Sequence, residues 1–231
     1  MGRSLPVQVL LFLQWLKQTE GRDKLYRLVA YGSKVPIHLL KEGGGDKDLV
    51  ERLSRGASAV GLTRKLMRVF RSVEFLNDLV KATEIKDNFE RNASFLKAFA
   101  LMWWMIADHA QWMAKAGYLR LTKDQQSSVD RMHSKAWFVG LLAGVAISLY
   151  KLVPIMDQLR VARSGPADAK AVDELESKQR KTVQGLVKNA VDLIIPTARL
   201  KWIDVSDLAV GLAGTFTSVI GIIDTYPVAL K

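Results

Sequence analysis

The apolar residues of this chain recur at steps of three and four positions almost everywhere, which is the spacing of one face of an α-helix. The alternation of β-branched and polar residues that marks a half-buried strand is missing from the sequence, and the six prolines are scattered. The chain has 231 residues, which is long enough to bury a core. Together these features predict an all-α protein.

Two uncharged apolar runs are candidates for crossing a membrane. Ala136–Tyr150 lies between two lysines, and Trp137 and Tyr150 stand where interfacial aromatic residues are expected. Leu208–Ile223 lies between two aspartates. Because both runs are shorter than the about 20 residues of an ordinary span, snorkelling side chains or a locally thinner bilayer would have to make up the difference.

Small residues in these two runs are spaced so that a second helix can approach closely. We expect them to mediate helix packing and self-association: Gly140, Gly144, Gly211, Gly214, Ser218 and Gly221. A third apolar segment, Ala93–Met113, is interrupted by Lys97, Asp108 and His109. These polar residues favour an interfacial or buried helix there over a span.

The segment Gly61–Val80 has two opposite faces when it is placed on a helical wheel at about 100° per residue. The aliphatic face consists of Leu62, Leu66, Val69, Val73, Leu76 and Val80. The cationic face consists of Arg64, Lys65, Arg68 and Arg71. Helices of this kind lie in the headgroup region, where each cation contributes about 1 kcal/mol near an anionic bilayer. We therefore expect the cationic face to bind anionic phospholipid and the aliphatic face to wedge into the leaflet.

The alternative for this segment is a helix whose apolar stripe packs on neighbouring helices while its basic face is solvated. Upstream of the segment, Leu49, Leu53 and Val60 point about 180° away from the later stripe. We therefore expect Gly56 and Gly61 to mark a kink or a change of packing partner. Taken with the apolar runs, the pattern predicts a membrane-associated helical bundle with amphipathic interfacial helices and two or three hydrophobic spans.

The charge balance favours an anionic partner. Lysine and arginine number 34 against 23 aspartates and glutamates, a net charge of +11. A phospholipid surface and nucleic acid both satisfy this charge, but no zinc finger, RNP-like strand or helix-turn-helix accompanies it, so nucleic acid is not expected. The absence of cysteine excludes disulfides, thiol catalysis and cysteine-ligated zinc, and fits a reducing compartment.

The residues that usually carry enzyme chemistry are not grouped in this sequence. His38, His109 and His133 are separated and lack metal-ligand spacing. No nucleophile elbow, phosphate loop or dinucleotide fingerprint follows a strand, and Asp108–His109 is interpreted as an ordinary polar pair. We expect no catalytic activity, no bound metal and no cofactor.

The chain is predicted to have four regions. They are an N-terminal amphipathic helical region at 1–92, central hydrophobic helices at 93–163, a polar linker at 164–182, and a C-terminal helix with a hydrophobic span at 183–231. In the first region, helices are expected around Asp23–Lys41 and Lys47–Thr83, with a break at Gly43–Asp46. The run Val7–Leu16 is followed by no small-residue cleavage site, so we expect an amphipathic helix there.

Four segments resemble the peroxin-11 family, and they occur in the family's order: Gly21–Arg27, Thr63–Arg68 with Glu74, Val187–Leu193 and Leu208–Gly214. The likeness runs from about Gly21 to Ile223, and the C-terminal pieces, including Trp202, resemble fungal members. It implies a protein of the peroxisomal membrane that elongates the organelle before division and so controls peroxisome number and size. It also implies self-association, a fission adaptor and dynamin-type GTPase as partners, and insertion of an amphipathic helix near Arg64–Arg71 into the outer leaflet.

Two other functions remain open from the sequence. One is a solute channel of the peroxisomal membrane, lined by Lys97, Asp108 and His109 in an otherwise apolar helix. The other is a soluble basic helical bundle that binds an anionic partner.

Overall fold

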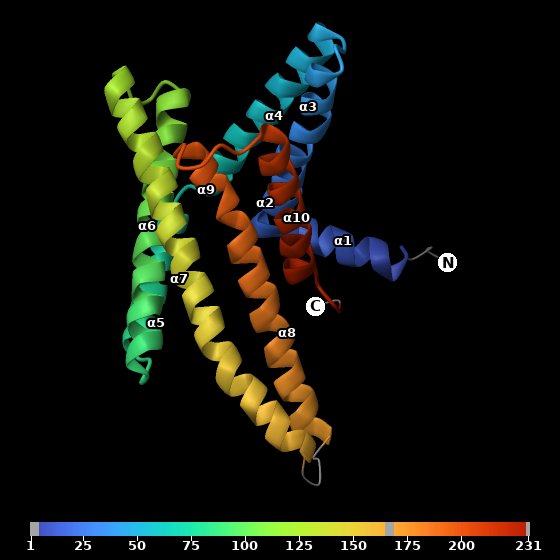
Figure 1. Ribbon diagram of the computed structural model, residues 1–231. Helices are drawn as coiled ribbons and strands as arrows, with labels where there is room; N and C mark the ends of the chain where they lie inside the picture. Colours follow the sequence, from blue (N-terminus) through green and yellow to red (C-terminus); the bar gives the residue numbers. More distant parts are fainter. Residues whose placement is uncertain (1–4, 165–168, 230–231) are drawn as a thin grey trace. The chain divides into compact units, whose positions relative to one another are not determined.

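The computed structural model describes residues 5–164 and 169–229 of the chain. These residues form helices joined by turns, with no strand among them, so the all-α prediction is confirmed (Figure 1). The helices are α1 Val7–Lys17, α2 Thr19–Gly32, α3 Lys34–Glu42, α4 Lys47–Met67, η1 Arg71–Val73, α5 Glu74–Thr83, α6 Asn88–Lys115, α7 Lys123–Ser164, α8 Ala169–Asp192, α9 Ile194–Arg199 and α10 Asp207–Thr225.

Side chains cap several helices at the positions where the chain enters them. The Asp46 carboxylate accepts the amide of Asp48 at 2.9 Å, and the Asp87 carboxylate accepts the amide of Glu90 at 2.7 Å. Such N-caps satisfy backbone donors that have no partner inside the helix. The break expected at Gly43–Asp46 is therefore present, with α3 ending at Glu42 and α4 beginning at Lys47.

The helices form two compact units, and the second is inserted in the sequence between the two parts of the first. Unit 1 contains the chain up to Val69 and the stretch from Asp204 onwards, and unit 2 contains Phe70–Ile203. In unit 1, α2 is central and contacts α1, α3, α4 and α10. Gly221 of α10 lies beside Lys24 and Gly214 lies beside Tyr31, so α10 runs antiparallel to α2.

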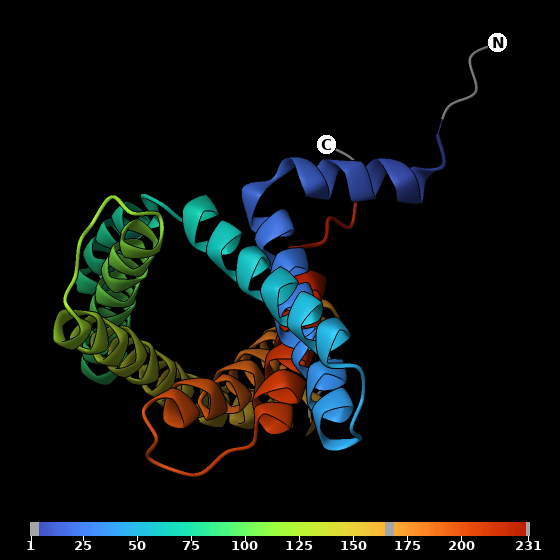
Figure 2. The ribbon, with the colours of Figure 1, turned by 90° about the horizontal axis from the view of Figure 1, so that it is seen from above.

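In unit 2 the short helix α5 packs on α6, and the long helices continue the series, α6 on α7 and α7 on α8 (Figure 2). The α6–α7 pair is an antiparallel hairpin. Trp104 of α6 stacks on Trp137 of α7, with ring centroids 5.5 Å apart, and Asp108 of α6 approaches His133 of α7 at 3.3 Å. Towards the other end, Glu90 pairs with Lys151 at 2.6 Å. Aromatic and polar contacts thus tie the hairpin along its length.

The N-terminal helices differ from the predicted ones at Ser33. Ser33 separates α2 from α3 within the single helix expected at Asp23–Lys41. At Gly56 and Gly61 the helix does not end, because α4 continues through both glycines to Met67, and the kink or change of packing partner expected there remains a prediction. A helical glycine costs only about 1 kcal/mol, which the packing of α4 on α2 and α3 offsets.

The predicted polar linker at 164–182 is mostly helical. Ser164 is the last residue of α7, and α8 already begins at Ala169; residues 165–168 lie outside the described residues. The stretch is polar because α8 has a solvated face, while its other face packs on α7. The two compact units divide the chain at other positions than the four predicted regions do. The boundaries of those four regions remain predictions.

Candidate membrane interface

Two helices in the part of the chain that the structure describes are long and apolar enough to cross a membrane, α7 and α10. In their most apolar stretches only 22% of the residues of α7 and 39% of those of α10 are buried within the chain. A core helix of a water-soluble protein would be mostly buried. These helices correspond to the two strongest runs in the sequence, whereas α6, which contains Ala93–Met113, is not among the candidate spans.

Helix α10 has a small-residue face and a bulky face. The small face packs on α2 and α3: a Cβ at Gly214 would overlap the ring of Tyr31 in α2, and one at Gly211 would lie 2.9 Å from Cβ of Lys34 in α3. On the opposite side four large apolar side chains stay exposed, at Leu212, Phe216, Val219 and Ile223. Their steps of three and four residues make a continuous stripe, which is the surface expected to face lipid.

The six small residues that the sequence singled out for helix packing all lie in contacts within this chain. Gly140 faces Leu101 and Gly144 faces Asn189, both in unit 2. In unit 1, Gly211, Gly214 and Gly221 face α2 and α3, and Ser218 is fully buried. Self-association through these residues remains a prediction.

The polar residues of α6 are divided between the hairpin contact and its surface. Asp108 is fully buried against His133, while Lys97 and His109 are half-buried. The long-range pair Asp108–His133 was not expected from the sequence, which offered only the neighbouring His109. Asp108 serves a contact between helices, and the solute channel remains a prediction. No group of three His, Asp or Glu side chains in the described ranges could hold a metal ion.

The predicted cationic face is divided by the structure. Arg64 is buried and donates two hydrogen bonds to the Asp23 carboxylate of α2, at 3.0 and 3.3 Å. Arg68 is buried as well, and Lys65 is half-buried. Arg71 lies in unit 2 and pairs with Glu74 at 3.1 Å. Arg64 and Arg68 therefore support the interior of unit 1 and do not form an open lipid-binding surface.

The surroundings of Asp23 keep its carboxyl group ionised. Burial alone would raise its pKa, but the positive charges of Arg64, Arg68 and Lys24, with the hydrogen bond from Arg64, outweigh burial, so the pKa of Asp23 lies below its ordinary value. Burial lowers the pKa of Arg64, and the Asp23 carboxylate offsets part of that effect. The two groups thus form a buried ion pair between α2 and α4.

The predicted aliphatic face is not one continuous helix. The chain leaves α4 after Met67, and Phe70 takes a left-handed backbone with φ of 69° before η1 and α5 begin. Leu62, Leu66 and Val69 belong to unit 1, whereas Val73, Leu76 and Val80 belong to unit 2. A single helix over Gly61–Val80 is therefore wrong, because three residues after Met67 leave the helical path.

In unit 2 the second half of this face forms an exposed apolar row along η1 and α5. We name it the α5 apolar row; its members and exposed fractions are Phe70 78%, Val73 59%, Leu76 51% and Val80 60%. On the side of α5 that packs on α6, Phe75 and Leu79 are half-buried and Ala82 is buried. The apolar sector of α5 is therefore too wide for α6 to cover, and one edge of it remains open.

Phe70 was not part of the predicted face. On a continuous wheel it falls outside the aliphatic stripe, and it joins Val73 only because the chain breaks there. Large aromatic residues rarely take a positive φ, so no simple sequence signal indicated this position.

The long apolar helices with exposed bulky stripes define a helical membrane protein. The family model described as Peroxisomal biogenesis factor 11 (PEX11) matches residues 9–226, and the chain belongs to this family. The recognition made from the sequence motifs is thereby confirmed.

Relatives named as peroxisomal membrane proteins come from distant organisms. Peroxisomal membrane protein PMP30B of Candida boidinii is 23% identical, over 93% of this chain and 92% of its own. Peroxisomal biogenesis factor 11 of Schizosaccharomyces pombe is 22% identical and Peroxisomal membrane protein 11A of Homo sapiens 21%, over 93% and 94% of this chain and 93% and 96% of theirs. No solved structure matches the chain. The chain is a protein of the peroxisomal membrane.

Proposed function

We propose that this protein elongates the peroxisomal membrane by inserting the α5 apolar row into one leaflet, and that it has no catalytic activity of its own. The observation that carries the proposal is the row itself: four apolar side chains, each at least half exposed, of which Leu76 and Val80 lie on the short helix α5 and Phe70 and Val73 lie in the turn and η1 before it. Both α5 and η1 pack against the long helix α6. Moving them from water into the acyl region would stabilise the bound state by at least about 4 kcal/mol.

Insertion of the α5 apolar row into one leaflet expands that leaflet relative to the other. The two candidate spans α7 and α10 would hold the chain in the bilayer, so the row acts on a membrane to which the protein is already anchored. Copies gathered by self-association would add their strain and draw the membrane into a tube. The family resemblance supplies the later partners in this proposal, a fission adaptor and a dynamin-type GTPase.

The test uses the full chain reconstituted into liposomes that contain anionic phospholipid. Electron microscopy scores tubes made by the wild type and by L76N/V80N, which makes two members of the row polar without adding charge. We expect the variant to stay in the membrane through its spans and to lose most tubulation. Tubulation equal to that of the wild type would overturn the proposal.

The matched control is M156N/V161N in α7. These side chains also lie in unit 2, and their exposed fractions of 52% and 71% are similar to those of Leu76 and Val80. Because they are far along the chain from the α5 apolar row and beyond the uncharged run of α7, the control should tubulate like the wild type. Peroxisome length in cells that express each variant gives a second readout of the same comparison.

A further inference from the structure

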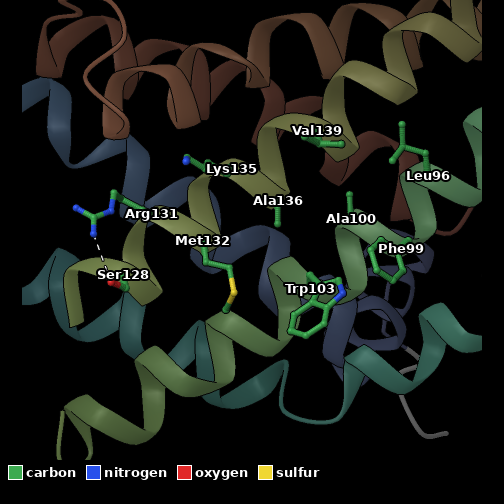
Figure 3. Close-up of a pocket in the computed structure, with 10 residues that line it drawn as sticks. All are labelled: Leu96, Phe99, Ala100, Trp103, Ser128, Arg131, Met132, Lys135, Ala136 and Val139. Atoms are coloured by element: carbon green, nitrogen blue, oxygen red, sulfur yellow. Dashed lines mark hydrogen bonds between the residues drawn. The ribbon is translucent and has the colours of Figure 1, made fainter. Parts of the chain in front are cut away.

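The α6–α7 hairpin carries a groove that the proposed membrane elongation does not use. It encloses about 500 Å³ and lies between the two helices of the hairpin, entirely inside unit 2 (Figure 3). This volume is within the range of about 300–1,000 Å³ that is usual for sites that hold one small ligand.

The two ends of the groove differ in chemistry. At one end Arg131, Lys135 and Ser128 of α7 gather, and the Arg131 guanidinium donates to the Ser128 hydroxyl at 3.3 Å (Figure 3). At the other end Leu96 and Phe99 of α6 face Val139 of α7. A ligand that fits both ends has an anionic head and an apolar tail.

The cationic end has no acidic lining. None of the residues that line the groove is an aspartate or glutamate, and within the described ranges neither Arg131 nor Lys135 forms an ion pair with a carboxylate. Two cations and a hydroxyl suit the several acceptor oxygens of a phosphate group. The charge of this end is thus available to a bound anion.

The position of the groove along α7 matches the depth profile of a bilayer. Arg131 and Lys135 come directly before the uncharged run Ala136–Tyr150, and Val139 lies inside it. The wall of the groove also includes Trp103 of α6, which is partly exposed. The cations would therefore stand at headgroup level while the apolar walls extend into the acyl region.

We propose that the α6–α7 groove binds one anionic phospholipid, with its phosphate on Arg131 and Lys135 and one acyl chain along Trp103, Phe99 and Val139. The site selects lipid by headgroup charge, since a zwitterionic headgroup brings a cation of its own to the same two side chains. It is separate from the α5 apolar row, so lipid selection and leaflet wedging are two distinct properties of unit 2.

Native mass spectrometry of the delipidated full chain in detergent tests the headgroup contact. The probes are phosphatidylglycerol, phosphatidylcholine with the same acyl chains, and oleate. We expect one phosphatidylglycerol per chain at low lipid concentration, and about thirtyfold weaker binding in R131Q/K135Q. The control K178Q/K181Q removes the same charge from exposed positions of α8 in the same unit and should bind like the wild type.

Fluorescence tests the path of the acyl chain. Phosphatidylglycerol with brominated chains should quench the wild type more than W103F, because the quencher reaches Trp103. L76N/V80N should bind this lipid like the wild type, because the α5 apolar row is not part of the groove. Lipid binding can therefore be tested whether or not the proposed tubulation is observed. Equal binding by R131Q/K135Q and K178Q/K181Q would overturn the proposal. Oleate binding in place of phosphatidylglycerol, or quenching that is the same in W103F, would overturn it as well.

Discussion

The last turns of α4 and the helix α5 both mix basic and aliphatic residues, yet they bury opposite kinds of side chain. At the end of α4, Arg64 and the capping residue Arg68 are buried, and the aliphatic Leu66 is half exposed. In α5, Phe75 and Leu79 are half-buried and Ala82 is buried, while Leu76 and Val80 stay exposed. The difference comes from Asp23, which offers the α4 cations a buried partner that α5 does not have. Arginines on a helix face can bind lipid headgroups only where no carboxylate of the same chain pairs with them, as Asp23 pairs with Arg64 here.

The largest expected effect comes from breaking the buried pair. R64M leaves the Asp23 carboxylate buried without its main partner, which should lower the free energy of unfolding by about 3–5 kcal/mol. Chemical unfolding in detergent, followed by circular dichroism, measures this loss. R52M on the same helix is the control: Arg52 pairs with Asp48 at 2.8 Å on the surface, and its loss should cost at most about 0.5 kcal/mol.

A double variant separates the cost of an unpaired charge from the value of the pair. D23L/R64M replaces both charged groups by apolar ones and should recover much of the stability that R64M loses. If R64M lowered the free energy of unfolding no more than R52M does, the buried pair would not stabilise the fold. The proposed difference between α4 and α5 would then be wrong.

Acid should weaken unit 1 through the same pair. The pKa of Asp23 is lowered in the folded chain from a reference value of 3.8, so the unfolded chain binds a proton at this site first as the pH falls. The contribution of Asp23 to stability is therefore complete above pH 3.8 and is lost as the pH falls through the lower folded pKa. Thermal midpoints from neutral to acid pH should drop more steeply for the wild type than for D23N. Parallel curves would exclude Asp23 as the source.

A smaller effect tests whether α4 is one continuous helix. A Cβ at Gly61 would meet nothing within 4 Å, and the residue lies inside α4. G61A should raise the free energy of unfolding by about 0.5–1 kcal/mol, because alanine loses less backbone entropy in a helix. A destabilised G61A in the same unfolding assay would mean that the chain needs a bend at this glycine.

The smallest effect is expected at the one predicted cation that belongs to unit 2. Among the described residues Arg71 pairs only with its neighbour Glu74, whose side chain is exposed. R71Q should change the free energy of unfolding by less than about 0.5 kcal/mol. A loss as large as that of R64M would show that Arg71 supports the interior of unit 2 and that the two regions are alike.

Local chemistry made part of this structure predictable. The glycines and Asp46 that end α3 and cap α4 act within a few residues, so the break between these helices could be read from the sequence. The candidate spans α7 and α10 followed from uncharged runs. Three members of the α5 apolar row, Val73, Leu76 and Val80, were also in the predicted wedge.

The features that were missed depend on distant partners. Arg64 and Asp23 are 41 residues apart, and a helical wheel shows which way Arg64 points but not which helix it meets. The same holds for Asp108 and His133, which meet only when α6 and α7 form their hairpin. The left-handed backbone at Phe70 changes the direction of the chain, so the continuous wheel could not place that ring with Val73.

Unit 1 is assembled from the N-terminal and the C-terminal parts of the chain, and this affects the order in which the protein folds during synthesis. Trp15 donates to Thr225 across 210 residues, and Arg27 donates to Thr217 across 190. Helices α1 to α4 emerge early from the ribosome, but α2 lacks the helix that covers it until α10 has been translated. Unit 2 is continuous in sequence and is free to fold while the ribosome is still at work. The N-terminal helices therefore complete their packing only after α10 has been made, and a nascent protein stopped before α10 leaves Tyr31 and Arg27 without their cover.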